Sequence, residues 1–435
     1  MNEAIRQETW FGHPKGLYVL FFVEMWERFC YYGMRSILIY YMIKQLMFAQ
    51  ERASYIYGLY TSAAYFFPFF GGILADRILG QKKTVIIGAS IMAVGEFVLM
   101  SQDLFYVGLA LMALGTGLFK PNVSTQVGTL YDVGDHRRDR AFNIFYMGIN
   151  LGAIMSPLIC GTLGELYGWK WGFMSAGIGL ILGLIVYIWG QKYLAQDLIS
   201  QKKEEKVEKK SASLSREDYA KIITLVILCI LNIVFWGAYE QQGNTLAVWV
   251  DQNTNRMIFG WEMPATWFQV FNPVMIIALI PMITVMWGWQ DKRKKEPSSI
   301  GKMAIACFLL GASFLVLVPG VWQYNSVGSA SLLWLLLSTS ILTVAEIYLS
   351  PVGLSLVTKL SPPRLISTIM GIWFFSMAGG QYFCGWLGTF YGKMPKDQFF
   401  GMIALICFAA GLMMLAVLKP LKKAIGHGRE ETADV

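Results

Sequence analysis

Residues 17–41 read LYVLFFVEMWERFCYYGMRSILIYY, a long apolar run that contains charged side chains but no proline. At a rise of about 1.5 Å per residue, a helix of this length crosses the roughly 30 Å hydrocarbon core of a bilayer. Five of its polar side chains recur at helical spacing and share one face; they are Glu24, Glu27, Arg28, Tyr31 and Arg35. Because lipid does not solvate charged groups, this face must turn toward other helices or a polar cavity.

Eleven further apolar runs follow this segment. With 55% hydrophobic residues and a mean hydropathy of +0.48, the chain of 435 residues has more apolar surface than a soluble domain can bury. The runs lie at 55–74, 84–100, 104–119, 140–164, 171–190, 219–240, 266–288, 301–319, 330–355, 366–390 and 398–418. The sequence therefore predicts an all-α membrane protein with twelve transmembrane helices, arranged as two six-helix bundles around a central cavity.

A charged stretch divides these helices six and six. Residues 191–218 contain a dense run of lysine and glutamate with almost no large apolar side chain, which is typical of a solvated linker. We expect an amino-terminal bundle at 1–190, this cytoplasmic linker, and a carboxy-terminal bundle with a cytoplasmic tail at 219–435. A weak internal repeat indicates duplication, because GGILADRILGQKK at 71–83 is echoed by GWQDKRK at 288–294.

The first copy of this repeat is similar to the loop between the second and third helices of the major facilitator superfamily, and the resemblance implies that fold. Its glycines, Gly71, Gly72 and Gly80, permit close helix approach and a tight turn. Asp76 and Arg77 can bond helix ends. We expect Gly72, Asp76 and Arg77 to form a conformational loop.

The distribution of Lys and Arg orients the chain in the membrane. Basic side chains gather in the even-numbered connections, which include the linker, and few lie on the opposite side. We therefore predict a multi-pass protein of the inner (plasma) membrane with both termini in the cytoplasm. Topology and anionic lipid account for the net charge of +8, and the sequence has no nucleic-acid-binding motif. The six cysteines have no metal-ligand spacing, so no metal site is expected.

Ionisable residues occur within the predicted helices of both halves. The amino-terminal half contributes Arg28, Arg35 and Lys120 with Glu24 and Glu27, and the carboxy-terminal half contributes Glu240 and Glu346. Four carboxylates thus face three cations, so one carboxylate lacks a full partner and is a candidate proton carrier. All three histidines lie outside the predicted spans, which leaves this role to a carboxylate. Position does not choose between Glu24 and Glu27, and Glu96 in the third span has no evident role.

Four motifs resemble those of the proton-dependent oligopeptide transporter family. They are EMWERFCYYG at 24–33, FYMGINLG at 145–152, FWGAYEQQG at 235–243 and EIYLSPVG at 346–353. Together with the loop that carries Asp76 they extend over nearly the whole chain. Many bacterial members have two additional helices between the bundles, and the linker is too short to hold them.

The resemblance implies a symporter that imports di- and tripeptides with protons by alternating access. Such a protein is not an enzyme and needs no cofactor besides the coupling proton. Proton coupling is expected at Glu24, Glu27 and Arg28. The residues expected to bind substrate are Arg28, Tyr31, Tyr32, Arg35, Tyr65, Lys120, Asn150, Trp236, Glu240, Asn272, Glu346, Ser350 and Trp373.

Within this set the resemblance places Arg28 and Lys120 near the peptide carboxylate. It places Asn150, Asn272 and Glu346 near the amino group. Taken singly, Asn150, Asn272 and Ser350 fit helix–helix bonding as well as ligand contact.

The charge pattern also predicts gating pairs. We expect Arg35 to pair with Glu240, and Lys120 with Glu346, when the cavity is closed to the outside. Expected partners are peptides, protons and the lipid bilayer, with no nucleic acid, and the chain is expected to act as a monomer. The alternative is a proton-coupled transporter of another small anionic or zwitterionic solute. A channel or a membrane enzyme would need a continuous polar pore or a nucleophile or metal constellation, neither of which the sequence contains.

Overall fold

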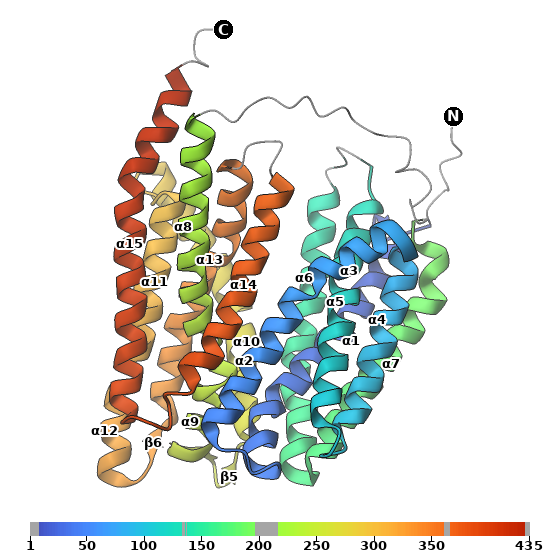
Figure 1. Ribbon diagram of the computed structural model, residues 1–435, viewed down its shortest axis with the longest axis vertical. Coiled ribbons are helices and arrows are strands. Elements are labelled where there is room, and N and C mark those ends of the chain that lie inside the picture. The colour runs from blue at the N-terminus through green and yellow to red at the C-terminus, as the bar shows by residue number, and fades with distance from the viewer. Residues whose placement is uncertain (1–7, 133–134, 136, 196–215, 361–365, 431–435) are drawn as a thin grey trace. The chain divides into compact units, whose positions relative to one another are not determined.

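The structure falls into two compact units. The computed structural model (Figure 1) describes residues 8–132, 135, 137–195, 216–360 and 366–430. Unit 1 comprises Met1–Phe48, Ala63–Glu208 and Pro264–Val270, and unit 2 comprises Ala49–Ser62, Lys209–Met263 and Phe271–Val435.

Two short segments therefore pack with the unit that the other half of the sequence mainly forms. They are 49–62, which belongs to unit 2, and 264–270, which belongs to unit 1. Boundaries drawn at 190 and 219 from composition do not anticipate these exchanges. Most of the expected linker, 196–215, lies outside the described residues.

The amino-terminal half of the chain is helical almost throughout. Its helices are α1 (Lys15–Tyr40), η1 (Tyr41–Gln45), α2 (Gln50–Phe66), α3 (Pro68–Leu74), η2 (Ala75–Leu79), α4 (Gln81–Leu99), α5 (Phe105–Thr129), α6 (Arg137–Ser156), η3 (Pro157–Gly161), η4 (Leu163–Tyr167), α7 (Trp169–Gly190) and η5 (Gln191–Tyr193). Adjacent helices such as α2, α3 and η2 follow one another without a loop and form one transmembrane segment.

The carboxy-terminal half repeats this organisation. Its helices are α8 (Arg216–Tyr239), η7 (Glu240–Gly243), α9 (Thr245–Asn253), η8 (Ala265–Val270), α10 (Phe271–Lys292), α11 (Ser299–Leu315), α12 (Leu317–Val327), α13 (Leu332–Leu360), α14 (Ile366–Gly388) and α15 (Lys396–Glu430).

The strands of the described residues are two residues long and join the helices at their ends. They pair as β1 (Thr9–Trp10) with β2 (His13–Pro14), β3 (Thr254–Asn255) with β6 (Ala330–Ser331), and β4 (Met257–Ile258) with β5 (Trp261–Glu262). The first and third pairs are antiparallel and the second is parallel.

Each predicted span coincides with one continuous helical segment, which confirms the all-α membrane fold. Among the described residues, eight helical segments qualify as membrane spans by length and apolar composition alone. The other four contain α1, α4, α5 and α14, with 26, 19, 25 and 23 residues. At about 1.5 Å per residue these helices are roughly 28–39 Å long, which suffices for a core of about 30 Å.

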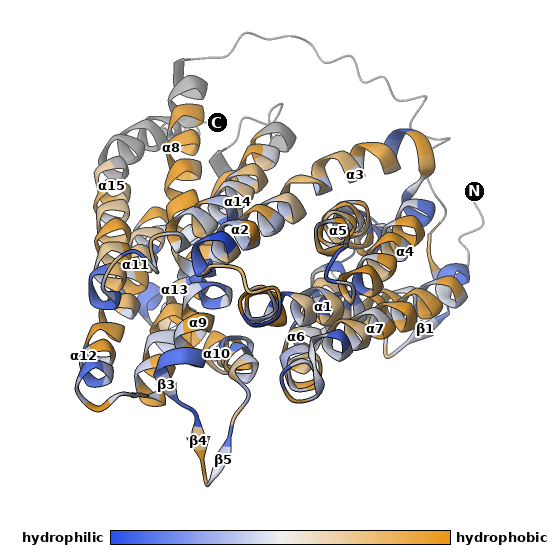
Figure 2. Cartoon of the chain, turned by 60° about the horizontal axis from the view of Figure 1, so that its bottom comes forward, coloured by the Kyte–Doolittle hydropathy of each residue, from blue (hydrophilic) through white to orange (hydrophobic). Residues whose placement is uncertain are grey.

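Helix α7 shows that a transmembrane helix can have one face suited to lipid and one face packed against protein. Large apolar side chains at helical spacing are exposed along one face; they are Ile178, Ile181, Leu182, Ile185 and Ile188. The opposite face buries Phe173, Leu180 and Tyr187. Figure 2, in which the ribbon is coloured by residue hydropathy, shows apolar residues along most of the helices drawn in colour. A helix that exposes such a face is suited to a lipid environment.

In unit 1, the segments expected in the cytoplasm meet at one end of the bundle. The amino group of Lys82, at the start of α4, donates to the carbonyl oxygens of Gln191 and Leu194 at 3.2 and 3.3 Å. His13 Nδ1 lies 2.8 Å from the Tyr131 hydroxyl, beyond the end of α5. Burial lowers the pKa of the His13 ring, so the neutral form is favoured in this contact.

In unit 2, the first part of α2 packs against α14 through glycine. A Cβ atom added to Gly58 would lie 2.4 Å from the Cα of Gly385, so the two backbones touch. Ser54 donates to Asn244 Oδ1 at 2.6 Å, and Gln50 donates to the Gly388 carbonyl at 3.0 Å. Small residues let the helices approach, and polar side chains then bond across the contact.

Candidate functional site

The charged face of α1 forms a buried ion cluster in unit 1. Glu24, Glu27 and Arg28 are 3%, 0% and 3% exposed. Arg28 holds Glu27 through two bonds, Nε to Oε2 at 2.5 Å and Nη2 to Oε1 at 2.6 Å. Its Nε lies 3.3 Å from Glu24 Oε1, while Glu24 Oε2 has no hydrogen-bond partner among the described residues. The two acids are therefore not equivalent, because Glu27 is fully paired and Glu24 is only partly paired.

Aromatic rings and a glycine position this cluster. The guanidinium carbon of Arg28 lies 5.0 Å from the ring centroid of Tyr31 and 5.8 Å from that of Tyr32, within cation–π range. A Cβ atom at Gly152 on α6 would lie 2.9 Å from Arg28 Cβ and 2.4 Å from the Met25 carbonyl oxygen. The glycine of the FYMGINLG motif thus allows α6 to contact α1 beside the ion cluster.

Two further cations of the predicted set lie in unit 1, and both contact aromatic rings. The amino group of Lys120 is 4.2 Å from the ring centroid of Tyr65, and the guanidinium carbon of Arg35 is 5.9 Å from that of Tyr32. Both cations are partly exposed, unlike Arg28. A charged ligand can therefore reach these two cations more easily than it can reach the buried cluster on α1.

Asn150 makes a bond within its own helix in this conformation. It is 7% exposed and donates from Nδ2 to the Tyr146 carbonyl oxygen, one turn earlier on α6, at 2.9 Å. Such a bond within a helix matches a structural role, so ligand contact by Asn150 stays a prediction.

A second carboxylate centre lies in unit 2, where three helices meet. The Tyr239 hydroxyl at the end of α8 donates to Glu346 Oε2 on α13 at 2.7 Å. Asn272 on α10 donates to the same oxygen at 3.1 Å and to Thr343 at 3.0 Å. The structure brings the predicted residues Asn272 and Glu346 together. It adds Tyr239, which lies within the FWGAYEQQG motif but was not among the predicted site residues.

The remaining predicted residues of unit 2 surround this centre or pack nearby. Trp236 is 8% exposed, and its ring lies 5.1 Å from that of Tyr239. Its indole nitrogen has no hydrogen-bond partner within the described part of the chain. Glu240 is 3% exposed, at the start of the 3-10 turn that follows α8. Trp373 is 2% exposed and packs on Gly353, where an added Cβ would lie 2.5 Å from its ring. Ser350 is partly buried one turn after Glu346.

The expected conformational loop differs from the structure in that Asp76 and Arg77 lie in the π-helical segment η2, not in a loop. The glycines act as expected at two positions. The chain turns at Gly80, whose φ is +82°, and α3 approaches α5 at Gly71, where a Cβ atom would lie 2.0 Å from the Gly117 carbonyl oxygen. Gly72 has open space. Adjacent glycines look alike in sequence, and only the packing of α3 on α5 separates them.

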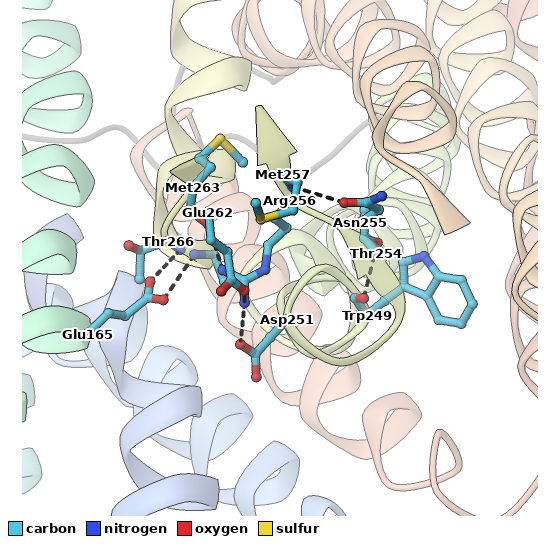
Figure 3. A network of polar contacts seen from close by, with 11 residues as sticks. Glu165, Trp249, Asp251, Thr254, Asn255, Arg256, Met257, Glu262, Met263 and Thr266 are labelled. Carbon is cyan, nitrogen blue, oxygen red and sulfur yellow. Dashed lines mark hydrogen bonds and ion pairs between the residues drawn. The ribbon is translucent and has the colours of Figure 1, made fainter. Parts of the chain in front are cut away.

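A carboxylate outside the predicted site holds the start of η8 within unit 1. Glu165 on η4 accepts the backbone N–H of Ala265 at 3.0 Å and of Thr266 at 2.8 Å (Figure 3). The Trp267 indole donates to Thr162 at 2.7 Å. These bonds explain why 264–270 belongs to unit 1 although α10 belongs to unit 2.

Within unit 2, the hairpin before this segment has its own polar network. Figure 3 shows Arg256 among Asp251, Glu262 and Met263. Its guanidinium group bonds the Met263 carbonyl at 2.6 Å and Glu262 at 2.8 Å, and lies 3.6 Å from Asp251. The hairpin therefore ends at a fixed point directly before Pro264.

The family model described as the POT family matches residues 82–219 and 194–409. The chain belongs to the POT family. Among its relatives, the uncharacterised transporter YclF of Bacillus subtilis (strain 168) is 34% identical over 97% of both chains. The peptide transporter YePEPT of Yersinia enterocolitica subsp. palearctica is 32% identical over 96% of both chains.

A crystal structure of a peptide transporter POT in complex with sulfate has the same fold. Its TM-score is 0.88 at 34% identity, over 96% of this chain and 97% of that chain. The chain thus has the membrane transporter fold of the major facilitator superfamily, as the motifs indicated.

Members of the POT family that resemble this chain are longer. The alignment with YclF extends over 482 positions, more than the 435 residues of the chain, so the relative has residues that this chain lacks. The two family matches overlap at residues 194–219, which include most of the expected linker. That the linker is too short for additional helices stays a prediction.

Proposed function

We propose that this POT family member is a symporter that imports di- and tripeptides with protons by alternating access. The observation that carries the proposal is the division of charge between the units. Unit 1 has Lys120 and Arg35 partly exposed, and unit 2 has Glu346 with Tyr239 and Asn272 around one carboxylate oxygen. A peptide has a carboxylate at one end and an ammonium group at the other, which suits this pair of chemistries. The relative YePEPT is named a peptide transporter, which supports the same substrate class.

Proton coupling would belong to the α1 cluster. Arg28 is fixed on Glu27 by two short bonds, so Glu27 serves as the permanent counter-ion. Glu24 has one oxygen without a partner in a buried site, and a proton on that oxygen would remove an uncompensated charge. We therefore assign proton binding to Glu24 and the positioning of Arg28 to Glu27.

The membrane context follows from the same proposal. The chain would lie in the inner (plasma) membrane as a monomer, in contact with lipid, with both termini in the cytoplasm, as the distribution of basic residues predicts. The coupling ion is the proton, and no other cofactor is required.

Uptake by purified protein in proteoliposomes tests the proposal. Labelled dialanine should accumulate when an inward proton gradient is imposed, and should only equilibrate when an ionophore removes the gradient. Glu346→Gln, which is close to isosteric, should raise the KM for dialanine because it removes the acid expected to bind the ammonium group. The proposal fails if wild-type protein accumulates none of several di- and tripeptides. Accumulation of a different small zwitterion or anion instead would favour the alternative substrate class.

A further inference from the structure

Unit 1 contains another buried acid, Glu96 on α4, which the proposed mechanism does not use. Its side chain is 0% exposed. The Cys30 thiol on α1 donates to Glu96 Oε1 at 3.2 Å, and in the part of the chain that the structure describes Glu96 Oε2 has no hydrogen-bond partner. Among the ion pairs found in the described residues, none includes Glu96.

Among the residues that the structure describes, none near Glu96 supplies a compensating charge. The titratable groups near it are the thiols of Cys30 on α1 and Cys160 on η3. On the side of α7 it meets Gly177, where an added Cβ would lie 3.2 Å from Glu96 Cβ. Glu27 is one turn before Cys30 on α1, and its cation Arg28 is already engaged there.

A carboxylate enclosed in this way is costly. Burial of an ionised carboxyl without a cation or a full set of donors costs several kcal/mol or more, so the group is neutral and holds a proton. A thiol is a weak donor and compensates little of that charge. A glutamine or an aliphatic side chain would fill the same space without this dependence on a proton.

We propose that Glu96 is a second proton-carrying acid of unit 1, which gives up its proton when its contact with Cys30 opens to water and takes it back when that contact closes. This inference rests on the proposed symport function. In the closed packing the carboxyl is protonated, and Cys30 keeps its own proton. When the contact opens, the O–H bond of Glu96 breaks, the proton passes to water, and the carboxylate is solvated. Each transport cycle would thus move one proton more than the α1 cluster moves alone.

Infrared spectroscopy of the purified protein tests the protonation without any transport assay. The difference between wild type and Glu96→Gln should contain the carbonyl band of a protonated carboxyl group. Cys30→Ala should shift that band, because it removes the thiol donor, while Met92→Leu, one turn away on α4, should leave it in place. Absence of the band from wild type would show an ionised Glu96 and overturn the proposal.

The proton-to-peptide ratio, measured from the membrane potential at which net flux reverses, tests the function. Glu96→Gln should lower the ratio by one proton per peptide while peptide exchange at equal pH continues, and Met92→Leu should keep the wild-type ratio. An unchanged ratio in Glu96→Gln would reduce Glu96 to a packing residue. If wild type moves no peptide, the proposed function fails. The infrared band then still shows whether Glu96 is protonated.

Discussion

Glu24 and Glu27 share one arginine on α1, but they share it unequally. Arg28 forms two bonds with Glu27 and approaches Glu24 with one nitrogen at 3.3 Å. We expect Glu24→Gln to lose most proton-driven accumulation while retaining exchange of labelled for unlabelled peptide, since exchange needs no titrating acid. Glu27→Gln should reduce both activities at least tenfold, because it leaves Arg28 without its two-bond partner. Parallel measurement of uphill uptake and exchange checks this, and equal losses in both variants would contradict the assignment.

Tyr239 is the neighbour that fixes Glu346 in unit 2. Its hydroxyl donates to Glu346 at 2.7 Å and lies 3.3 Å from Asn272 Oδ1. A hydrogen bond to a charged group contributes about 1.5–3 kcal/mol. Tyr239→Phe should therefore raise the KM for dialanine by about tenfold or more, with a smaller effect on the maximal rate. Tyr348→Phe, on the same helix as Glu346, is the matched control, and an equal effect there would remove Tyr239 from the site.

At the scale of helices, the contact of α2 with α14 in unit 2 depends on missing side chains. A Cβ atom at Gly58 would lie 2.4 Å from the Gly385 Cα, whereas one at Gly371 on α14 has open space. Gly58→Ala should destabilise the protein by about 1–3 kcal/mol, because neither backbone can yield without displacing its helix. Gly371→Ala should be close to neutral.

Thermal unfolding followed by a thiol-reactive dye measures this difference. All six cysteines are buried and become reactive only as the chain opens. A lower Tm for Gly58→Ala than for Gly371→Ala is expected. Identical curves would mean that the helices separate at no cost.

The start of η8 is held by one side chain of η4. Glu165 accepts two backbone N–H groups, from Ala265 and Thr266. Glu165→Ala leaves both donors without that acceptor, a loss of about 1–3 kcal/mol for each buried group. Hydrogen exchange at 265–266 should accelerate about tenfold or more, as read by mass spectrometry. Glu262→Ala, which removes an exposed partner of Arg256, should leave these amides unchanged, and acceleration in both variants would contradict a local role for Glu165.

For the whole molecule, alternating access requires contacts that form and break between the two units. The chain passes from unit 1 to unit 2 between Val270 and Phe271, directly after the segment that Glu165 holds. The pairing of Arg35 with Glu240 joins residues of different units, and it stays a prediction from the charge pattern. Coupled residues lose activity non-additively when both are replaced.

A double-mutant cycle on Arg35→Ala and Glu240→Ala, read by uptake and by labelling of a cysteine introduced on the outward-facing side, examines this gate. Each single variant should increase labelling, because it removes one member of the ion pair expected to stabilise the closed state. The free-energy effect of the double variant should be smaller than the sum of the two single effects, by about 1 kcal/mol or more. Simple additivity would move Arg35 from gating to substrate binding.

The sequence alone determined the membrane fold and the chemistry of α1. Hydropathy is a local property, so twelve apolar runs were enough to locate twelve spans, and the 3.6-residue period put Glu24, Glu27 and Arg28 on one face. The sequence also pointed to Glu346 and Asn272, because polar side chains are rare and costly within spans.

Only the tertiary structure decided which groups meet. Tyr239 and Glu346 are 107 residues apart, Cys30 and Glu96 are 66 apart, and Glu165 is 100 residues from Ala265. Which unit holds 49–62 and 264–270 likewise depends on packing. These contacts arise where side chains of different helices interlock, and no periodicity within one helix specifies the neighbour that its face will meet.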